Sequence, residues 1–141
     1  MSYLLDTNVL SEVRRPQPDP QVLAWLDQVD EDRTYLSVIS IAEIRRGIGL
    51  LDEGRRKLAL AEWLEGDLLD RFEGRVLPID AAAALAWGDL MADSKQRGFA
   101  LASMDGLIAA SAVSRGLTLV TRNTKDFVGL KLELLNPWGS D

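Results

Sequence analysis

Four acidic side chains occupy places where a folded chain could bring them together. One of them follows a short apolar run directly, in "YLLDTN" at residues 3–8. The four are Asp6, Glu43, Asp105 and Asp126. Grouped carboxylate oxygens are hard ligands that suit Mg²⁺ or Mn²⁺. This pattern indicates chemistry that depends on a divalent metal.

The composition excludes several other kinds of chemistry. The chain has no cysteine, which rules out a thiolate nucleophile, a disulfide framework and a cysteine-ligated zinc site. It has no histidine either, so the usual general base and the imidazole ligands of zinc or non-haem iron are missing. Any reaction here must use carboxylates, amides, hydroxyls, lysine or arginine.

A cluster of ionised carboxylates needs a partner of opposite charge. Two carboxylates about 4 Å apart repel by about 4 kcal/mol at an effective dielectric constant near 20. Such a cluster must either bind a cation or raise the pKa values of its members. Since the chain has no histidine to serve this purpose, Mg²⁺ or Mn²⁺ is the expected partner.

The elements that must position these acids alternate between strands and helices. Apolar and β-branched runs predict strands at residues 4–5, in the first half of 34–40, and at 74–80, 117–121 and 130–136. Helices are expected from Asp19-Pro20, over 41–51 and 58–68, from Asp80 towards Gly98, and over 103–115 before Gly116. The 141 residues suit one domain, 1–141. We expect an α/β three-layer sandwich whose central sheet is mainly parallel and flanked by helices.

Ligands of open parallel sheets collect at the carboxyl ends of the strands. Asp6, Glu43 and Asp126 each follow a predicted strand and converge there. Asp105 opens a helix that precedes a strand, and we expect such a helix to start at the opposite edge. Its inclusion therefore depends on the topology.

Each acid also has a purely structural interpretation. Asp6 could cap the turn after it, and Asp126 could cap a final turn. Ser40 and Glu43 fit the S-x-x-E capping box, in which the acid only completes a helix start. Asp105 at a helix start complements the helix dipole. No single residue decides between the two interpretations; several together favour the metal site.

Four ordered segments resemble one known family. "LLDTNVLSE", "LSVISIAEIRRGI", "MDGLIAASA" and "LVTRNTKDF" occur here in the order and rough spacing found in PIN-domain ribonucleases. Within them, the chain is similar to VapC-type toxins of bacterial toxin–antitoxin pairs. The segment "RRPQPDPQVLAWLD" and the terminal "NPW" resemble the FitB-like branch. The resemblance spans essentially the whole chain.

The resemblance implies roles for individual residues. Asp6 matches the first metal-binding aspartate, Glu43 the glutamate of the second segment, and Asp105 the aspartate of the third segment. In the family fold, the third segment lies at the strand edge. By the same resemblance, all three are catalytic metal ligands.

The fourth acid and the supporting residues follow from the same resemblance. Some FitB-like members have an acid where this chain has Asn123, whereas other VapC sequences have asparagine there and the acid three residues later, as at Asp126. We assign the fourth ligand to Asp126 and treat Asn123 as a supporting group. Thr7 or Asn8 would position Asp6, and Thr121 matches a polar residue that follows the fourth strand.

The implied function is a Mg²⁺- or Mn²⁺-dependent endoribonuclease that acts as the toxin of a type II toxin–antitoxin system. RNA would be its substrate, and it would form a homodimer held by a cognate antitoxin. Two other classes remain open. A PIN-like module that binds RNA or protein without cutting would lack one or more of the acids. An aspartyl-phosphate protein would favour D-x-D after the first strand, which "DTN" fits poorly.

Charge and hydropathy bear on the location and the partners. No run approaches the roughly 18 apolar residues of a membrane span, and the start lacks a signal-peptide pattern, so a cytoplasmic location without membrane contact is expected. A net charge of −6 argues against a nucleic-acid partner. Basic clusters that could bind phosphates stand at 14–15, 45–46 and 55–57.

Overall fold

The computed structural model describes residues 1–139, and its centre is a five-stranded sheet in which every pairing is parallel. The strand order is β3-β2-β1-β4-β5. The strands are β1 (Tyr3–Leu5), β2 (Thr34–Ser37), β3 (Val76–Leu77), β4 (Thr118–Val120) and β5 (Leu134–Leu135). The parallel sheet predicted from the alternation of elements is confirmed. The predicted domain extends to residue 141, and its last two residues lie outside the described part.

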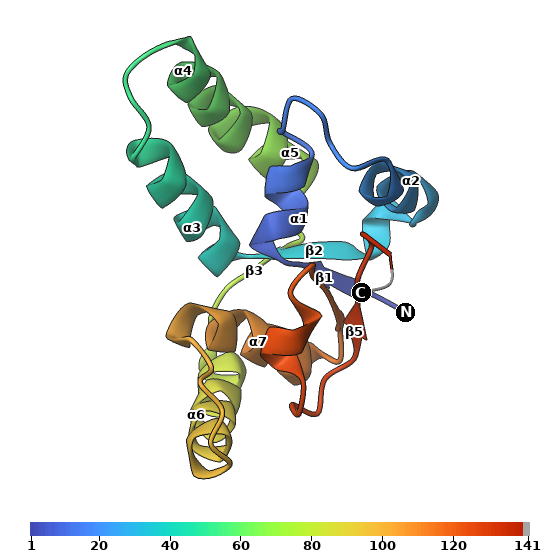
Figure 1. Ribbon diagram of the computed structural model, residues 1–141, viewed down its shortest axis with the longest axis vertical. Helices are drawn as coiled ribbons and strands as arrows, with labels where there is room; N and C mark the ends of the chain where they lie inside the picture. The colour runs from blue at the N-terminus through green and yellow to red at the C-terminus, as the bar shows by residue number, and fades with distance from the viewer. Residues whose placement is uncertain (140–141) are drawn as a thin grey trace.

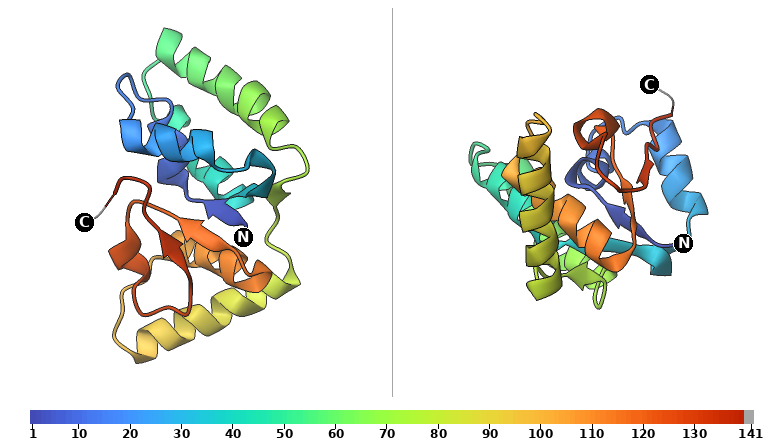
Figure 2. Two further views of the ribbon diagram at one scale, coloured as in Figure 1. Left: turned by 90° about the vertical axis from the view of Figure 1, so that its right-hand side faces the viewer. Right: turned by 90° about the horizontal axis from the view of Figure 1, so that it is seen from below.

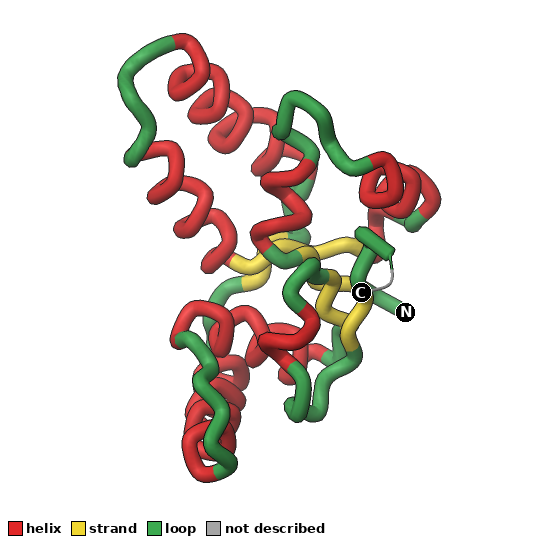
Figure 3. Tube along the Cα trace, in the orientation of Figure 1, coloured by secondary structure: helices red, strands yellow, loops and turns green. Residues whose placement is uncertain are grey.

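Helices cover both faces of the sheet and make three layers (Figure 1). The tube in Figure 3 shows the strands as a thin middle layer between the two groups of helices. One layer contains α1 (Thr7–Glu12), α2 (Pro20–Gln28), α3 (Val38–Gly49), α4 (Arg55–Glu62), the π-helix η2 (Trp63–Leu68) and α5 (Leu69–Arg71). The other contains α6 (Ala81–Gln96) and α7 (Ser103–Arg115), and single 3-10 turns are η1 (Glu31–Arg33) and η3 (Thr124–Phe127). Seen from below in Figure 2, α6 crosses beside α7.

The alternation of side chains along the strands produces two cores. Leu4 packs into the core under α7, whereas Leu5 packs into the core under α1 and α3. Leu119 and Val120 divide in the same way on the neighbouring strand. All four side chains are almost fully buried, since successive residues of a strand point to opposite faces. Burial on both faces fixes the register and height of β1 and β4, whose ends carry the site.

Several helix ends follow the local signals. Asp19 caps α2 by accepting a hydrogen bond from the Gln21 N–H, with Pro20 at the first helical position. Asp80 caps α6 by accepting from the Ala83 N–H. Gly116 ends α7 in the left-handed conformation at φ 66°, which glycine adopts without steric cost. These predictions are confirmed.

The observed strands are shorter than the apolar runs from which they were predicted, and the structure contains one helix that the sequence did not predict. Only residues 76–77 of the predicted strand 74–80 pair with a neighbour. Pro78 follows directly and has no N–H to continue a ladder. At the last predicted strand, residues 130–132 form tight turns instead, with the Leu132 N–H bonded to the Leu130 carbonyl. The helix α1, just after the first strand, was not predicted.

Within the described residues, no helix combines the length and the apolar character needed to cross a membrane.

Candidate active site

Asp6 stands at the carboxyl end of the central strand. Its N–H donates to the Val120 carbonyl at 2.9 Å, which continues the β1–β4 pairing to the last position of the strand. Its carboxylate accepts from the Thr7 N–H at 2.7 Å and from the Thr121 hydroxyl at 2.7 Å. The first bond caps α1, so the predicted cap at Asp6 is present, and this does not exclude a second role for the carboxylate. The second bond holds the other oxygen towards Thr121, the residue after β4. Asp6 is only 5% exposed.

The environment of Asp6 favours its protonated form. Burial raises the pKa of this carboxyl from 3.8 to about 6, and the negative charges of Asp105 and Glu43 add to the rise. The hydrogen bonds from Thr121 and Thr7 oppose it, because they stabilise the carboxylate. A buried acid among other acids is therefore held at the strand end by two donors.

Glu43 is held by a side chain from another element and does not complete a capping box. Helix α3 begins one turn earlier than that motif requires, because Ser37 is its cap and accepts from the Ile39 N–H at 3.0 Å. The capping-box interpretation with Ser40 is therefore wrong. The Thr7 hydroxyl lies 2.6 Å from Oε1 of Glu43 and 2.8 Å from the hydroxyl of Ser40. A carboxylate only accepts, so Thr7 donates its single proton to Glu43 and Ser40 donates to Thr7.

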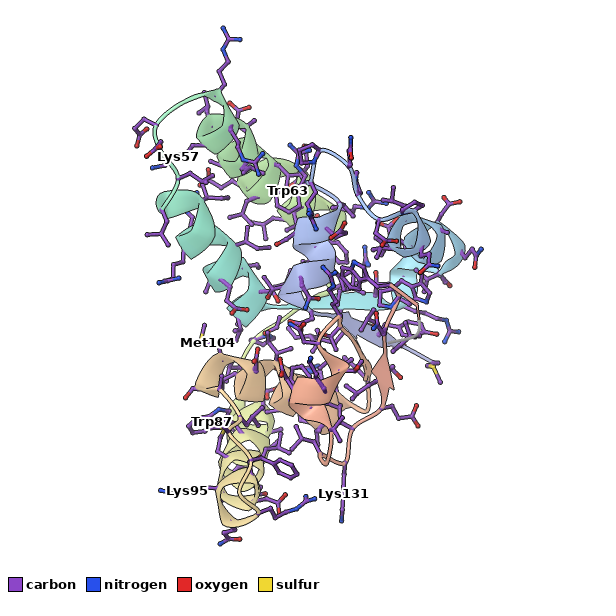
Figure 4. All side chains as sticks on the ribbon, viewed as in Figure 1. Lys57, Trp63, Trp87, Lys95, Met104 and Lys131 are labelled. Carbon is purple, nitrogen blue, oxygen red and sulfur yellow. The ribbon has the colours of Figure 1, made fainter. Side chains whose placement is uncertain are left out.

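Asp105 reaches the same edge of the sheet, contrary to the expectation from its place before a strand. Helix α7 joins β4 through a tight turn at Gly116 and must run antiparallel to that strand. The end of α7 therefore lies where β4 begins, and the start of α7 lies where β4 ends. Met104, labelled in Figure 4, marks that start, and α7 contacts α3. The opposite-edge expectation was wrong because a crossover helix reverses direction.

Close packing fixes the start of α7 against α6. The Trp87 indole N–H donates to the Ser103 carbonyl at 3.2 Å. A Cβ at Gly106 would lie 2.7 Å from Sδ of Met91 and 3.1 Å from Nε1 of Trp87. A larger residue here would require the Met91 and Trp87 side chains to shift, and the residue next to Gly106 is Asp105. The carboxylate is thus carried by a rigid part of the fold.

The four acids share one electrostatic environment. Burial raises the pKa of Asp105, and the charges of Glu43 and Asp126 raise it further. Because Asp105 also acts on Asp6, the charge interactions connect all four side chains. Asp126 lies in η3 and is exposed. The four acids predicted from sequence therefore interact through their charges at the carboxyl edge.

The predicted supporting residues form a chain of hydrogen bonds around Asp6. The Thr121 hydroxyl accepts from the Asn123 N–H at 3.1 Å and from the Asn8 side-chain amide at 3.4 Å. Asn8 in turn accepts from the Arg122 N–H at 3.4 Å. Thr121 is fully buried, whereas Asn123 is exposed and only its backbone N–H takes part.

Comparison with known proteins identifies the family of this chain. The family model described as PIN domain matches residues 3–130. The chain belongs to the PIN-domain family. Nucleases of this family generally depend on divalent metal ions. The resemblance seen in the four sequence segments is confirmed.

Curated relatives of this PIN-domain chain cover almost its whole length. "VapC ribonuclease Y4jK" of Sinorhizobium fredii is 42% identical over 135 residues, which are 96% of each chain. "Toxin FitB" of Neisseria gonorrhoeae is 44% identical over 135 residues, 96% of this chain and 97% of that protein. The similarity to the FitB-like branch is therefore confirmed.

Solved structures show the same fold. The crystal structure of FitAcB from Neisseria gonorrhoeae superposes with a TM-score of 0.92 at 43% identity and covers 98% of this chain and 99% of that one. A toxin–antitoxin complex from Klebsiella pneumoniae superposes with a TM-score of 0.72 at 26% identity, covering 96% and 98%. The PIN-like three-layer architecture is confirmed.

Sequence reasoning missed the role of Ser40, which is fully buried and bonded to Thr7. Its serine type and its place three residues before an acid suggested a cap, so the signal was present but was assigned to the wrong structure.

Glu12 was also missed. It is only 4% exposed and accepts from the Asp19 N–H at 2.8 Å, which holds the proline-rich loop to the end of α1.

The donor set suits a hard divalent cation, although the acids are not tightly clustered. Within residues 1–139, no three acidic side chains are close enough to one another to form a metal site by themselves. Mg²⁺ usually keeps several waters and takes one or two carboxylates in addition to substrate phosphates. The arrangement at this PIN-domain edge, with Asp6 and Glu43 fixed by hydroxyls, is compatible with that mode of binding.

Proposed function

We propose that this chain is a metal-dependent endoribonuclease and the toxin of a type II toxin–antitoxin system. Two relatives that match nearly its full length are named as a ribonuclease and a toxin. The observation that carries the proposal is the set of four acids, from four separate elements, that act on one another's charge at the carboxyl edge of the sheet. The reaction would be hydrolysis of an RNA phosphodiester. In this proposal the PIN-like domain spans residues 1–141.

Asp6, Glu43, Asp105 and Asp126 would hold Mg²⁺ or Mn²⁺. When bound, such an ion acidifies an attacking water and neutralises charge on the leaving oxygen. The chain itself fixes the carboxylates: Thr121 and the Thr7 N–H hold Asp6, and the Thr7 hydroxyl holds Glu43. Burial, together with the charges of neighbouring acids, raises the pKa values of Asp6 and Asp105, so a bound cation would favour the ionised form of both.

The partners follow from the same relationship. We propose that the chain acts on RNA and binds a cognate antitoxin protein. The antitoxin would hold it as a homodimer in the cytoplasm, where RNA is available. Sedimentation of the isolated chain should give a dimer at high concentration. A monomer at that concentration would contradict the homodimer. A small neighbouring gene for a DNA-binding antitoxin is expected beside the gene for this chain.

The alternative is a PIN-like module that binds RNA or protein without cutting. Such a module has no need to keep a complete set of acids. Here all four are present, and the burial of Asp6 works against its ionisation. Retaining an unfavourable buried acid favours the cleaving enzyme.

Cleavage of RNA by Asp6→Asn and Asp105→Asn proteins tests the proposal. Each amide keeps the shape of the side chain but removes the charge that anchors the ion. We expect both variants to lose cleavage in Mg²⁺ or Mn²⁺ while circular dichroism shows a native fold. The matched control is Asp27→Asn, an exposed acid on α2, which should cut normally. Full activity of Asp6→Asn in RNase-free preparations would falsify the metal-nuclease proposal.

A further inference from the structure

A polar pocket of about 460 Å³ lies beside the acids, and neither the family comparison nor the proposed metal site accounts for it. Its size falls in the range of about 300–1,000 Å³ that is usual for small-ligand sites. One wall comes from the segment after β4, one from the tail after β5, and one from the start of α2. The side chains that matter are Arg122, Asn123, Lys125, Asn136, Trp138 and Asp19.

Arg122 lies over an aromatic partner in this pocket. Its Cζ atom is 5.5 Å from the centroid of the Trp138 ring. Trp138 also packs against the core next to β1, which holds the ring in place. Arg122 itself is exposed. The tryptophan therefore places a cation–π contact under a guanidinium group that belongs to an exposed residue.

The two cations of the pocket have no acidic partner in the part of the chain that the structure describes. Among residues 1–139, neither Arg122 nor Lys125 forms an ion pair. Three cations of the basic clusters, Arg15, Arg45 and Lys57, pair with glutamates, whereas Arg14, Arg46, Arg55 and Arg56 form no ion pair within the same residues. The unpaired state of Arg122 and Lys125 matters because both line one pocket. In a chain of net charge −6, two adjacent unpaired cations mark a place for an anionic ligand.

The pocket is connected directly to the acidic edge. The Arg122 N–H donates to Asn8, and the Asn123 N–H donates to the Thr121 hydroxyl that holds Asp6. The segment that supplies the cations therefore begins one residue after the site. A ligand in the pocket lies next to whatever the acids act on.

We propose that this pocket binds one unpaired nucleotide of the RNA, adjacent to the phosphodiester that is cut. Its phosphate lies on Arg122 and Lys125, and its base stacks on the exposed face of the Arg122 guanidinium. Single-stranded RNA is commonly recognised by stacking of bases on aromatic rings or arginine planes. Asp19, on the α2 wall, repels a phosphate, which places the phosphate on the opposite wall after β4. This inference rests on the proposed ribonuclease function.

Binding of a short fluorescent oligouridylate, measured by anisotropy in EDTA, tests the pocket without cleavage. We expect Arg122→Ala to weaken binding about tenfold, since one stacked base and one phosphate contact are lost. Lys125→Ala should weaken binding less. It should also reduce the slope of log affinity against log salt by about one, as expected for the loss of one phosphate contact. Arg122→Lys should keep the salt slope but lose affinity, because lysine has no planar group. The matched control is Arg33→Ala, which lies before β2 at the opposite edge of the sheet.

Two further readouts separate this inference from the proposed function. The oligouridylate should quench tryptophan fluorescence in the wild type and not in Trp138→Phe. In cleavage assays, Arg122→Ala should raise KM with little change in kcat, whereas Asp6→Asn should lose kcat. Pocket-dependent binding by a wild type that cannot cut RNA would reject the ribonuclease and keep the nucleotide pocket. Three outcomes would overturn the pocket proposal. The first is unchanged binding in both Arg122→Ala and Lys125→Ala, and the second is no RNA binding by the wild type. The third is binding of an acidic peptide, in place of RNA, that depends on Arg122.

Discussion

The Thr121 hydroxyl donates a 2.7 Å hydrogen bond to Oδ2 of Asp6, and both side chains are buried. The two residues are 115 positions apart in the sequence and meet because β1 and β4 are neighbours in the sheet. The bond stabilises the ionised form of an acid that burial would otherwise keep protonated. Thr121 is therefore a positioning residue for Asp6.

Replacing Thr121 by valine tests this relationship. The variant loses the hydroxyl but keeps the shape, so the pKa of Asp6 should rise further and stability at pH 7 should fall by about 1–3 kcal/mol. RNA cleavage should fall by about 10–100-fold, as when an outer partner of a metal ligand is removed. The pH–rate profile should move to higher pH, and Thr121→Ser should restore it. Thr118→Val, in the strand β4 that precedes Thr121, is the control, and an unshifted profile in Thr121→Val would contradict the positioning role.

The stability of the metal-free protein should fall as pH rises between about 4 and 6. The native state keeps the Asp6 proton up to a pKa of about 6, whereas the unfolded chain releases it near 3.8. Below pH 4 both states are protonated and the penalty is absent; above pH 6 the buried carboxylate is ionised and destabilises the fold by about 3 kcal/mol. Asp6→Asn lacks this penalty. Urea denaturation in EDTA at several pH values should show its advantage over wild type growing through this window, and a constant difference would reject the assignment.

Divalent ions should stabilise the wild type by mass action, since they bind the folded state. Thermal melts with and without Mg²⁺ or Mn²⁺ should show a rise in Tm for wild type and a much smaller rise for Asp6→Asn. At an ion concentration a hundred times the dissociation constant, the expected stabilisation is about 2.7 kcal/mol. Equal shifts in the two proteins would count against Asp6 as a ligand.

Glu43→Gln should lose RNA cleavage. The structure removes the only reason to expect otherwise, because Ser37 and not Ser40 caps α3. Glutamine would serve in a capping box but cannot supply the charge of a ligand. The comparison is Ser37→Ala, which should lower stability by about 1 kcal/mol through loss of the true cap and leave kcat largely unchanged. Normal cleavage by Glu43→Gln would exclude Glu43 from the ligand set.

Asp126→Asn and Asn123→Ala distinguish the two candidates for the fourth position. We expect the larger loss of cleavage in Asp126→Asn, because the charge of Asp126 reaches Asp105. Asn123 contributes its backbone N–H to Thr121, and an alanine keeps that bond. A larger loss in Asn123→Ala would reverse the assignment.

The sequence alone determined the features that depend on neighbours within a few residues. Asp19 with Pro20, Asp80 and Gly116 define helix ends through bonds or dihedral angles inside one turn. The alternating burial of Leu4 and Leu5 follows from the geometry of a strand. The acids themselves could be selected because each stands out by type against an apolar run or a helix start.

Tertiary structure decided what depends on direction and on partners distant in the sequence. Asp105 joins the site because α7 reverses against β4, a property of the chain path and not of the local pattern. Glu43 meets Thr7 across 36 positions, and an equally valid local motif pointed to Ser40 instead. Local patterns report bonds that close within a turn, whereas the contacts that hold the acids form only after separate strands and helices have packed together.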